Sequence, residues 1–587
     1  MALHRKWVAG CFDVRSSANI ARHLPAMADR QPARAALKIP RGRTADGAID
    51  YLSLSFAELD AEVDAWVSRL SAKGVRRGDR VLVMVRQGLP LIASVFALFK
   101  YGAVPVVIDP GMGLRSFFRC VRHSRPRALL GIPLAQVLSR VARSAFSTIA
   151  VRVKASSALT GRLTRASAQI AGASIGATPM RVSTVETAED ELAAILFTSG
   201  STGAPKGVCY THGMFDAQVR AIREAYGIEP GEIDLPLLPI FALFNPALGM
   251  TTIVPEIDPR RPAAVDPAKI LQAILQENVT NSFGSPTLWR KIATHADERG
   301  IVLPSLRRVL CAGAPVPPSL WAASTVFLTH GRLHSPYGAT EALPVSTIGA
   351  DEVLAETAVE TRRGGGTCVG RPLPGVTVKI IPVTDGPVAS LSAVGELPAG
   401  AIGEIVVGGA MVTQGYDALP EADVLSKIPA EAGAGASTES PAEAKRRGLW
   451  HRMGDCGYLD TRGRLWFCGR KAERVETAEG TWFTEQVEPI FNLHPFVLRS
   501  ALVGLGPKGS QRPVLILEVV KGMKPSAALK EDLSAWARIQ PQTVNLARIA
   551  DFLFHPSFPV DVRHNAKIHR LTLAKWAEET LRKNRGA

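Results

Sequence analysis

The 587-residue chain lacks an apolar run long enough to cross a bilayer, and it lacks a cysteine pattern for metal binding. A membrane-spanning helix needs about 20 consecutive apolar residues, and the segment Met1–Lys6 is not followed by the apolar core of a signal peptide. The seven cysteines are odd in number and include no Cys-x-x-Cys pair, which argues against a disulfide framework and against a zinc site. These absences predict a protein of the reducing cytoplasm.

Acidic residues are missing from one long stretch. Between Gly111 and Ile170 the chain has eleven Arg and Lys residues and no Asp or Glu, within a net charge of +16. Part of this stretch, residues 135–150, places apolar side chains near one face with arginines beside it: Val137, Leu138, Val141 and Phe146, with Arg140 and Arg143.

Three interpretations of this basic stretch remain open. It is a solvated face, or it attracts anionic lipid or an acidic protein, or it binds nucleic acid. Nucleic-acid binding is the least favoured, because no recognition motif accompanies the charge. We therefore expect weak, salt-sensitive contact with a membrane and no nucleic-acid partner.

The length of the chain exceeds what one hydrophobic core supports, so we expect at least two domains. Helical periodicity at Ser53–Leu70 and Pro90–Lys100 alternates with apolar runs at Arg80–Val85 and Ala103–Ile108. This alternation predicts parallel strands in an α/β layer.

Two other regions differ in composition and in the pattern of their apolar residues. Residues 420–448 contain few large apolar side chains, which predicts a mobile insertion. Past residue 470, two apolar runs flank a Gly-Pro-Lys-Gly turn, and a helical pattern follows at Ser526–Arg538. This end of the chain therefore predicts a small α+β domain.

The stretch from Thr198 to Gly207 is the most informative in the chain. It follows the apolar run Leu192–Phe197, which predicts a buried strand, and it combines glycines, four hydroxyl side chains and Lys206. Glycines let successive N–H groups turn inward to bind an anion, and hydroxyls and an ammonium add donors. A flexible linker is the alternative, but a linker needs no buried strand before it. The stretch is not a Walker A loop, because Pro205 precedes Lys206 and glycine follows it.

This stretch resembles the signature loop of the adenylate-forming (ANL) superfamily, which includes acyl-CoA synthetases, luciferases and peptide-synthetase adenylation domains. The resemblance implies an α/β fold with a large multi-lobed N-terminal domain of αβαβα layers at residues 1–469 and a small α+β lid domain at residues 470–587. It also implies ATP and Mg²⁺ as cofactors. The loop residues that it assigns to phosphate, with Thr198 also assigned to the metal, are Thr198, Ser199, Gly200, Ser201, Thr202, Gly203 and Lys206.

Two further motifs follow in the order that the superfamily requires. One resembles its adenine-side loop and the other its aromatic-Gly-x-Thr-Glu motif: Gly313, Ala314 and Pro315, and then Tyr337, Gly338, Thr340 and Glu341. In the family, the tyrosine stacks on the purine, the threonine meets the α-phosphate and the glutamate holds Mg²⁺. A purine suits an aromatic face and Mg²⁺ takes carboxylate oxygens, although a Thr-Glu pair alone is more often an ordinary helix start.

The last motifs lie toward the C-terminus. Asp455, in Gly-Asp-Cys-Gly-Tyr, and Arg470 resemble the family's ribose-binding carboxylate and hinge arginine. Lys567 resembles the lysine of its Gly-Lys-Ile motif, with Ala566 in place of the glycine. That lysine bridges the substrate carboxylate and the α-phosphate, where negative charge builds during attack. The implied first step converts a carboxylate and Mg-ATP into an acyl-adenylate and pyrophosphate, after which superfamily members rotate the C-terminal domain.

The chain departs from the CoA ligases at the positions that serve a second substrate. Ala472 stands where an acidic residue or lysine is usual, Trp482 stands close behind Gly480, and residues 238–246 contain no gating histidine. This last run and Phe467–Lys471 resemble the olefin-biosynthesis β-lactone synthetases. In that family a long-chain 2-alkyl-3-hydroxy acid is adenylated, and its own hydroxyl closes a β-lactone.

This second resemblance implies ATP-dependent β-lactone formation with release of AMP and pyrophosphate. The substrate-binding residues expected from it are His212, Phe241, Phe244 and Phe283, although core packing explains each phenylalanine equally well. A long-chain fatty acyl-CoA synthetase or fatty acyl-AMP ligase is the second hypothesis, and an inactive adenylate-binding scaffold is the third. The partners implied are the reductase that makes the hydroxy acid and the β-lactone decarboxylase, in the cytoplasm or at the membrane periphery.

Overall fold

The computed structural model describes residues 17–155, 181–198, 204–258, 264–431, 449–539, 544–549, 551–560 and 567–585. Several sequence predictions lie outside these ranges. They concern Ser199–Gly203 of the predicted phosphate loop, most of the insertion predicted at residues 420–448, and Ala566 beside Lys567.

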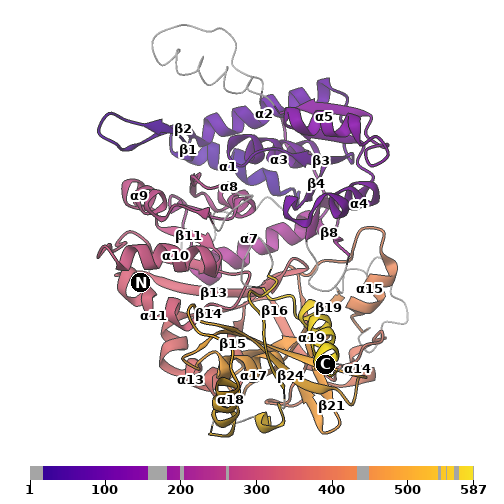
Figure 1. Ribbon diagram of the computed structural model, residues 1–587. Helices are drawn as coiled ribbons and strands as arrows, with labels where there is room; N and C mark the ends of the chain where they lie inside the picture. Colours follow the sequence, from indigo (N-terminus) through magenta and orange to yellow (C-terminus); the bar gives the residue numbers. More distant parts are fainter. Residues whose placement is uncertain are drawn as a thin grey trace.

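A six-stranded sheet forms the upper part of the molecule (Figure 1). Its strands are β3 Arg80–Met84, β4 Val104–Ile108, β5 Ala128–Gly131, β6 Val151–Lys154, β7 Leu192–Thr198 and β8 Lys206–Thr211. They lie in the order β6–β5–β3–β4–β7–β8, and all neighbours are parallel except β7 and β8. Because a helix joins β3 to β4 and the two strands are parallel, the predicted α/β layer is confirmed.

The structure describes six helices near this sheet, of which the second and third were predicted from their helical periodicity. They are α1 His23–Arg30, α2 Phe56–Ala72, α3 Leu89–Tyr101, α4 Leu114–Ser124, α5 Pro133–Val141 and α7 His212–Tyr226. The helix predicted from Ser53 begins at Phe56, because residues 49–55 form the last strand of another sheet. The Ser55 hydroxyl caps this helix, and the Glu58 side chain accepts the Ser55 N–H, which confirms the predicted capping box.

A fourteen-stranded sheet runs from the upper to the lower part of the molecule (Figure 1). Its strands are β1 Ala35–Arg43, β2 Ile49–Ser55, β9 Ile233–Asp234, β10 Thr251–Ile253, β11 Asn281–Gly284, β12 Arg308–Cys311, β13 Arg332–Ala339, β14 Ala342–Gly349, β15 Thr367–Pro372, β16 Val376–Ile381, β17 Gly403–Gly409, β18 Lys427–Pro429, β19 Leu449–Leu459 and β20 Leu465–Arg470. The neighbours in the row β1–β10–β9–β11–β12–β13 are parallel. The row continues β13–β14–β15–β20–β19–β17–β16, and these neighbours are antiparallel. The change from parallel to antiparallel pairing occurs at β13, which carries Tyr337.

Short and medium helices cover this second sheet. They are α8 Asn245–Leu248, α9 Pro267–Glu277, α10 Pro286–Asp297, α11 Pro318–Phe327, α12 Ala350–Glu352, α13 Ala358–Arg362, α14 Leu391–Val394 and α15 Pro420–Ser426. The prediction of a mobile insertion over residues 420–448 was wrong for its first ten residues. These residues form α15 and then β18, and β18 pairs with β19. Buried backbone pairing of this kind leaves no signal in composition.

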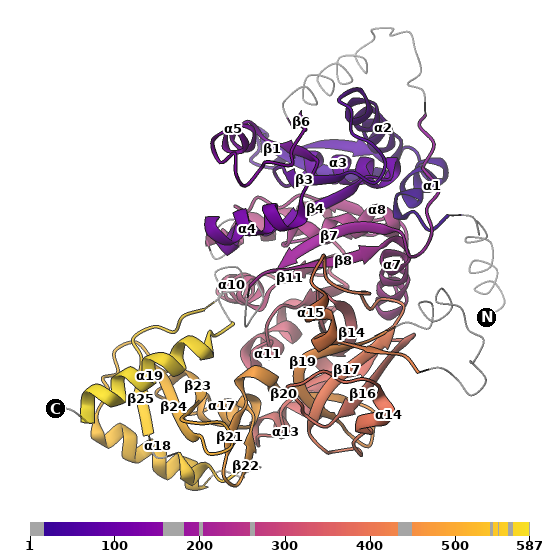
Figure 2. The same ribbon diagram turned by 90° about the vertical axis from the view of Figure 1, so that its right-hand side faces the viewer.

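The C-terminal residues form a small unit with cores of its own. Its elements are β21 Val475–Thr477, β22 Gly480–Trp482, α17 Thr484–Phe491, β23 Val497–Leu505, β24 Arg512–Val519, α18 Ala527–Ile539, β25 Asp551–Phe554 and α19 Arg570–Arg585. Two clusters of buried side chains are built only from residues 475–577, and Figure 2 shows the unit standing beside the rest of the molecule. We call residues 475–585 the C-terminal lobe. The predicted α/β class with a small α+β unit at its end is thereby confirmed.

Across the described ranges, we find no helix that combines the length and the apolar character needed to cross a membrane.

Candidate nucleotide and acyl site

Lys206 stands at the start of β8, just after the part of the predicted phosphate loop that lies outside the described residues. Its side chain is exposed, and the ammonium lies 4.6 Å from the centroid of the Tyr416 ring. An ammonium over an aromatic face is held by the ring quadrupole without being neutralised. Lys206 therefore remains available to a phosphate. Thr198 ends β7, and its side chain is among those not described.

Glu341 is fixed at the turn between β13 and β14. Its Oε1 accepts a hydrogen bond from the Tyr416 hydroxyl at 2.7 Å, and its carbonyl accepts the Thr413 N–H at 2.9 Å. The neighbouring Thr340 carbonyl accepts the Tyr210 hydroxyl at 2.5 Å. These bonds hold the Thr340–Glu341 turn next to Lys206, as the phosphate and metal predictions require.

Sequence reasoning missed a buried lysine behind this turn. Lys427 is 6% exposed, and its ammonium donates to the Thr413 carbonyl at 2.5 Å and to the Thr413 hydroxyl at 3.0 Å. Burial lowers the pKa of Lys427 to about 8, and Glu341 is the largest of the influences that oppose this drop. Lys427 is thus linked to Glu341 through Thr413. It lies in the stretch that composition assigned to an insertion, so no sequence pattern marked it.

Asp455, Arg470 and Tyr337 meet where β19 and β20 pair beside β13. Arg470 Nη1 lies 2.7 Å from Asp455 Oδ1, and the Tyr337 hydroxyl donates to Asp455 Oδ2 at 2.6 Å. Although Asp455 is only 3% exposed, its Oδ1 receives no well-aligned hydrogen bond from the described residues. Burial raises the pKa of Asp455, and Arg470 opposes this rise. A carboxylate has about four acceptor sites, and Arg470 and Tyr337 use one each, so Asp455 can also accept ligand hydroxyls, which is the chemistry expected for a ribose.

Lys567, in the C-terminal lobe, acts on Asp455 through its charge. The following residue, Ile568, makes a β-bridge with Val560, which orders the chain at the start of α19. The positive charge of Lys567 is among the influences that lower the pKa of Asp455. The structure therefore brings the tail-end lysine and the predicted ribose carboxylate into electrostatic contact.

The predicted adenine loop follows β12. Gly313 has φ of +94°, a backbone conformation that favours glycine, and Ala314 and Pro315 continue the loop toward α11. At Gly338 in β13, an added Cβ would lie 2.6 Å from the Ala342 carbonyl oxygen. The backbone bend that ends β13 thus depends on glycine, and this bend presents Thr340 and Glu341.

Phe241, Phe244 and Phe283 form one aromatic cluster next to this loop. The rings of Phe241 and Phe283 are stacked with centroids 3.5 Å apart, and those of Phe241 and Phe244 are 6.4 Å apart. Phe283 shares a buried cluster with Ala312 of the loop. The predicted alkyl-binding phenylalanines are therefore side by side, and they adjoin the predicted adenine loop.

His212 lies at the other end of this aromatic system. Its Nδ1 accepts the Ile20 N–H at 3.3 Å, and its ring meets Phe99 edge-on. Phe99 in turn contacts Phe215, which contacts Phe244. Burial lowers the pKa of His212 to about 4, so the imidazole is neutral at physiological pH. The structure thus separates His212 from the phenylalanine cluster by two intervening rings.

A magnesium site at Glu341 is compatible with the residues present. The described part of the chain contains no cluster of three or more His, Cys, Asp or Glu side chains arranged to hold a metal. Mg²⁺ is usually bound through one or two carboxylates together with substrate phosphates, so a single fixed carboxylate suffices when a nucleotide supplies the rest.

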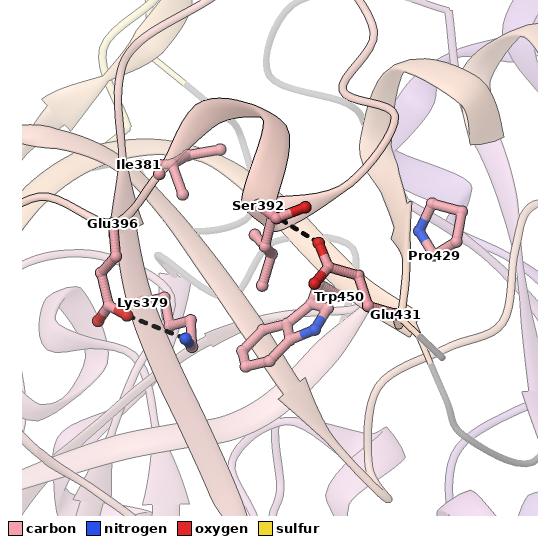
Figure 3. Close-up of a pocket in the computed structure, with 9 residues that line it drawn as sticks. Lys379, Ile381, Ser392, Glu396, Pro429, Glu431 and Trp450 are labelled. Carbon is pink, nitrogen blue, oxygen red and sulfur yellow. Dashed lines mark hydrogen bonds and ion pairs between the residues drawn. The ribbon is translucent and has the colours of Figure 1, made fainter. Parts of the chain in front are cut away.

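A surface cavity of about 380 Å³ lies elsewhere (Figure 3). It is lined by Lys379, Glu396, Trp450 and Glu431, among others, and Lys379 is paired with Glu396 at 2.9 Å. It contains none of the residues predicted to bind nucleotide or acyl chain. The residues predicted to bind the nucleotide lie instead on and beside β8, β13, β19 and β20.

Comparison with known proteins places these features in context. The profile of the AMP-binding enzyme family matches residues 25–417. The chain is 44% identical over 565 residues to the olefin β-lactone synthetase of Xanthomonas campestris pv. campestris, covering 96% of this chain and 98% of that protein. It is also 44% identical over 568 residues to the olefin β-lactone synthetase of Stenotrophomonas maltophilia, covering 96% and 99%.

A solved structure has the same fold. The O-succinylbenzoate coenzyme A synthetase of Bacillus subtilis, in complex with ATP and magnesium ion, superposes with a TM-score of 0.70 at 21% identity. The match covers 94% of this chain and 98% of that chain. At this level of identity the likeness establishes the shared fold.

Proposed function

The chain belongs to the AMP-binding enzyme family and, within it, to the olefin β-lactone synthetases, and from this membership we propose how its residues carry out the reaction. The protein is an AMP-forming ligase. The substrate that we propose is a long-chain 2-alkyl-3-hydroxy acid, which is adenylated and then closed to a β-lactone. The observation that carries this proposal is that Arg470 and Tyr337 bind the buried Asp455 carboxylate, on which the charge of Lys567 also acts.

In the first step, a carboxylate oxygen attacks the α-phosphorus of ATP, and the bond from that phosphorus to the bridging oxygen breaks to release pyrophosphate. We assign Asp455 to the ribose hydroxyls, because its buried carboxylate has acceptor sites beyond those used by Arg470 and Tyr337. Tyr337 and the Gly313–Pro315 loop are assigned to the adenine, with Arg470 holding Asp455 ionised. Lys206, Thr340 and residues 198–203 are assigned to the phosphates.

Two cations act on the charge that builds during this step. Lys567 is assigned to the α-phosphate and the incoming carboxylate, where a fixed ammonium stabilises the five-coordinate phosphorus. Mg²⁺, held by Glu341 and also assigned to Thr198, would neutralise phosphate charge. We propose residues 470–587 as the lid domain that carries Lys567, and residues 1–469 as the nucleotide-binding domain.

In the second step, the β-hydroxyl oxygen attacks the acyl-adenylate carbonyl carbon. A new C–O bond closes the four-membered ring, the bond from that carbon to the phosphate oxygen breaks, and AMP leaves with the electron pair. The hydroxyl proton passes to solvent. Attack from within the same molecule gains effective concentration and needs no site for a second acceptor. Phe241, Phe244 and Phe283 are assigned to the alkyl chains. His212 packs against Phe99, which leads through Phe215 to Phe244, and so supports this cluster indirectly.

An assay with and without CoA tests this proposal. We expect the protein, given ATP, Mg²⁺ and a 2-alkyl-3-hydroxy acid, to release one AMP for each β-lactone formed, at the same rate in both reactions. Mass spectrometry would detect the loss of one water from the acid. An absolute requirement for CoA, with an acyl-CoA as the product, would instead identify a long-chain acyl-CoA synthetase. Retention of acyl-AMP as the final product would identify an acyl-AMP ligase.

We also propose that α4 and α5 contact an anionic membrane surface, where a long-chain substrate would be found. Leu134, Val137 and Val141 follow helical spacing on α5 and are 72%, 56% and 77% exposed. This corrects the predicted apolar face of residues 135–150, because Phe146 is buried and Leu138 is half-buried. The proposed partner enzymes are the hydroxy-acid reductase and the β-lactone decarboxylase.

Arginines on α4 supply the charge that anionic lipid would need. Arg115, Arg119 and Arg122 are exposed, and no carboxylate of the described residues lies within ion-pair distance of them. Both helices lie along the same outer side of the upper part in the two views (Figures 1 and 2), and side chains of α4 pack with Phe146 after α5. An apolar ridge beside unpaired arginines is typical of an interfacial surface.

Sedimentation with vesicles checks this contact. We expect the protein to bind phosphatidylglycerol vesicles at low salt, to bind phosphatidylcholine vesicles little, and to be released at about 0.5 M salt because screening removes the attraction. The double variant Val137→Asp/Val141→Asp should lose most of the binding. Val326→Asp, at a valine of α11 that is similarly exposed, is the matched control and should bind normally. Equal binding by the double variant, or no sedimentation at low salt, would contradict the contact.

A further inference from the structure

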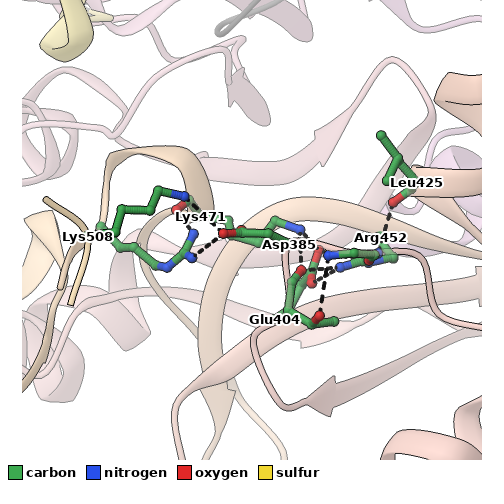
Figure 4. Close-up of polar contacts among 9 residues, drawn as sticks. Asp385, Glu404, Leu425, Arg452, Lys471 and Lys508 are labelled. Carbon is green, nitrogen blue, oxygen red and sulfur yellow. Dashed lines mark hydrogen bonds and ion pairs between the residues drawn. The ribbon is translucent and has the colours of Figure 1, made fainter.

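A short loop after β16, residues 384–386, is held by a buried ion pair. Arg452 and Glu404 form a buried ion pair at 2.7 Å, and Arg452 also donates to the carbonyls of Thr384 and Gly386 at 2.6 and 2.7 Å (Figure 4). Both charged side chains are almost fully buried, so the pair is fixed by packing as well as by charge. The loop residue between these two carbonyls, Asp385, is therefore presented on a rigid support.

The carboxylate of Asp385 binds two cations, one in the C-terminal lobe and one directly before it. Arg474 Nη2 and Lys508 Nζ each lie 2.9 Å from its Oδ2 (Figure 4). Arg474 also bonds Glu476 within the lobe, and the hydrogen bonds from Arg474 and Lys508 hold the pKa of Asp385 well below its usual range. These contacts join β21 and the turn before β24 to the large sheet.

A second set of contacts acts at the same junction. Lys471 donates to Glu404 at 2.9 Å and to the Thr384 carbonyl at 3.1 Å, and the Thr367 hydroxyl donates to Glu485 at 2.7 Å. Lys471 precedes the C-terminal lobe, so the bonds that depend on the placement of the lobe are those of Asp385 with Lys508 and of Thr367 with Glu485. In that placement the charge of Lys567 acts on Asp455.

We propose that Asp385 is a positioning residue that keeps the C-terminal lobe in this placement through both adenylation and lactone closure. The inference rests on the proposed function, because only an internal nucleophile removes the need for a second acceptor site. The β-hydroxyl is already attached to the adenylated acid, so no part of the lobe has to leave for another substrate to enter. Ring closure then takes place under the same lobe, with AMP as the leaving group and the hydroxyl proton lost to solvent.

Removal of Asp385 should therefore slow adenylation without weakening nucleotide binding. We expect Asp385→Ala to lower kcat for pyrophosphate exchange about fivefold, because exposed ion pairs shift such a balance only modestly. KM for ATP should stay unchanged, since the ribose and adenine residues belong to the other part of the chain. Asp385→Glu should restore most of the rate.

The matched control is Asp351→Asn, which removes an exposed carboxylate paired with Arg332 within the large sheet region. It should leave exchange unchanged. A purely structural role for Asp385 would instead lower the melting temperature and raise KM for ATP together. That result, or an unaltered kcat in Asp385→Ala, would overturn the positioning role.

Cross-linking tests whether the lobe must move between the two steps. In the double variant Asp385→Cys/Lys508→Cys, a short bis-maleimide would tie the lobe to the loop, and the single variant Asp385→Cys treated with the same reagent is the control. We expect the tied enzyme to exchange pyrophosphate and, in a single turnover with the hydroxy acid, to make β-lactone and AMP in equal amounts.

The outcomes separate this inference from the proposed function. A tied enzyme that accumulates acyl-adenylate, or that loses pyrophosphate exchange altogether, would overturn the single-placement inference, provided that the untied double variant still makes lactone. An untied enzyme that makes acyl-adenylate but no lactone would overturn the proposed function itself. Equal lactone yields with and without the tie support both.

Discussion

Lys567→Ala is expected to lower the rate of adenylation by about 10²–10³-fold, the usual cost of removing one preorganised group that stabilises charge in a transition state. We expect this loss because of where Lys567 lies. It belongs to the C-terminal lobe, and its charge acts on Asp455, which is assigned to the nucleotide. ATP binding should change little, because the lysine is assigned to charge that appears during attack and not to the ground state.

Pyrophosphate exchange measures this effect, with ATP affinity determined separately by titration. Lys530→Ala, at an exposed lysine of α18, is the matched control for loss of a positive charge from the same lobe. It should exchange at the normal rate. Lys567→Arg should recover only part of the activity, since a planar guanidinium does not replace a point charge. Normal exchange in Lys567→Ala would remove this residue from the mechanism.

Asp455→Ala is expected to raise KM for ATP by more than about tenfold, since hydrogen bonds to a charged group contribute about 1.5–3 kcal/mol each. Its carboxylate has acceptor sites beyond those that Arg470 and Tyr337 use, and a ribose would donate to them. The same change also leaves Arg470 without its carboxylate, and breaking a buried pair costs about 3–5 kcal/mol of stability. We therefore expect a lower melting temperature as well.

The two effects are separated by a control in the same strand pair. Asp460 accepts hydrogen bonds from Arg464 at 2.7 Å and from Trp466 at 3.0 Å, and it has no assigned role toward nucleotide. Asp460→Ala should lower the melting temperature while leaving KM for ATP unchanged. An unaltered KM for ATP in folded Asp455→Ala would contradict the ribose assignment.

Local periodicity and motif order in the sequence determined the class of fold and the place of most candidate residues. The strands around Val81–Val83 and Val106–Ile108, the capped helix from Phe56 and the apolar strand before Thr198 follow from side-chain pattern alone. Each depends on neighbours within a few residues, and the pattern therefore carries the information. The order of the motifs, from Lys206 to Lys567, likewise lies along the chain.

The tertiary structure alone decided which of these residues meet and what holds them. Tyr416 supports Glu341 directly and Lys427 supports it through Thr413, and Asp385 binds cations about 90 and 120 residues later in the chain. Residues 420–429, which were predicted to belong to an insertion, form a helix and a paired strand in the tertiary structure. Such contacts arise from the pairing of distant strands and the burial of single polar side chains, which no local period encodes. Composition shows how many charges a chain has, whereas only folding shows which of them are left facing a ligand.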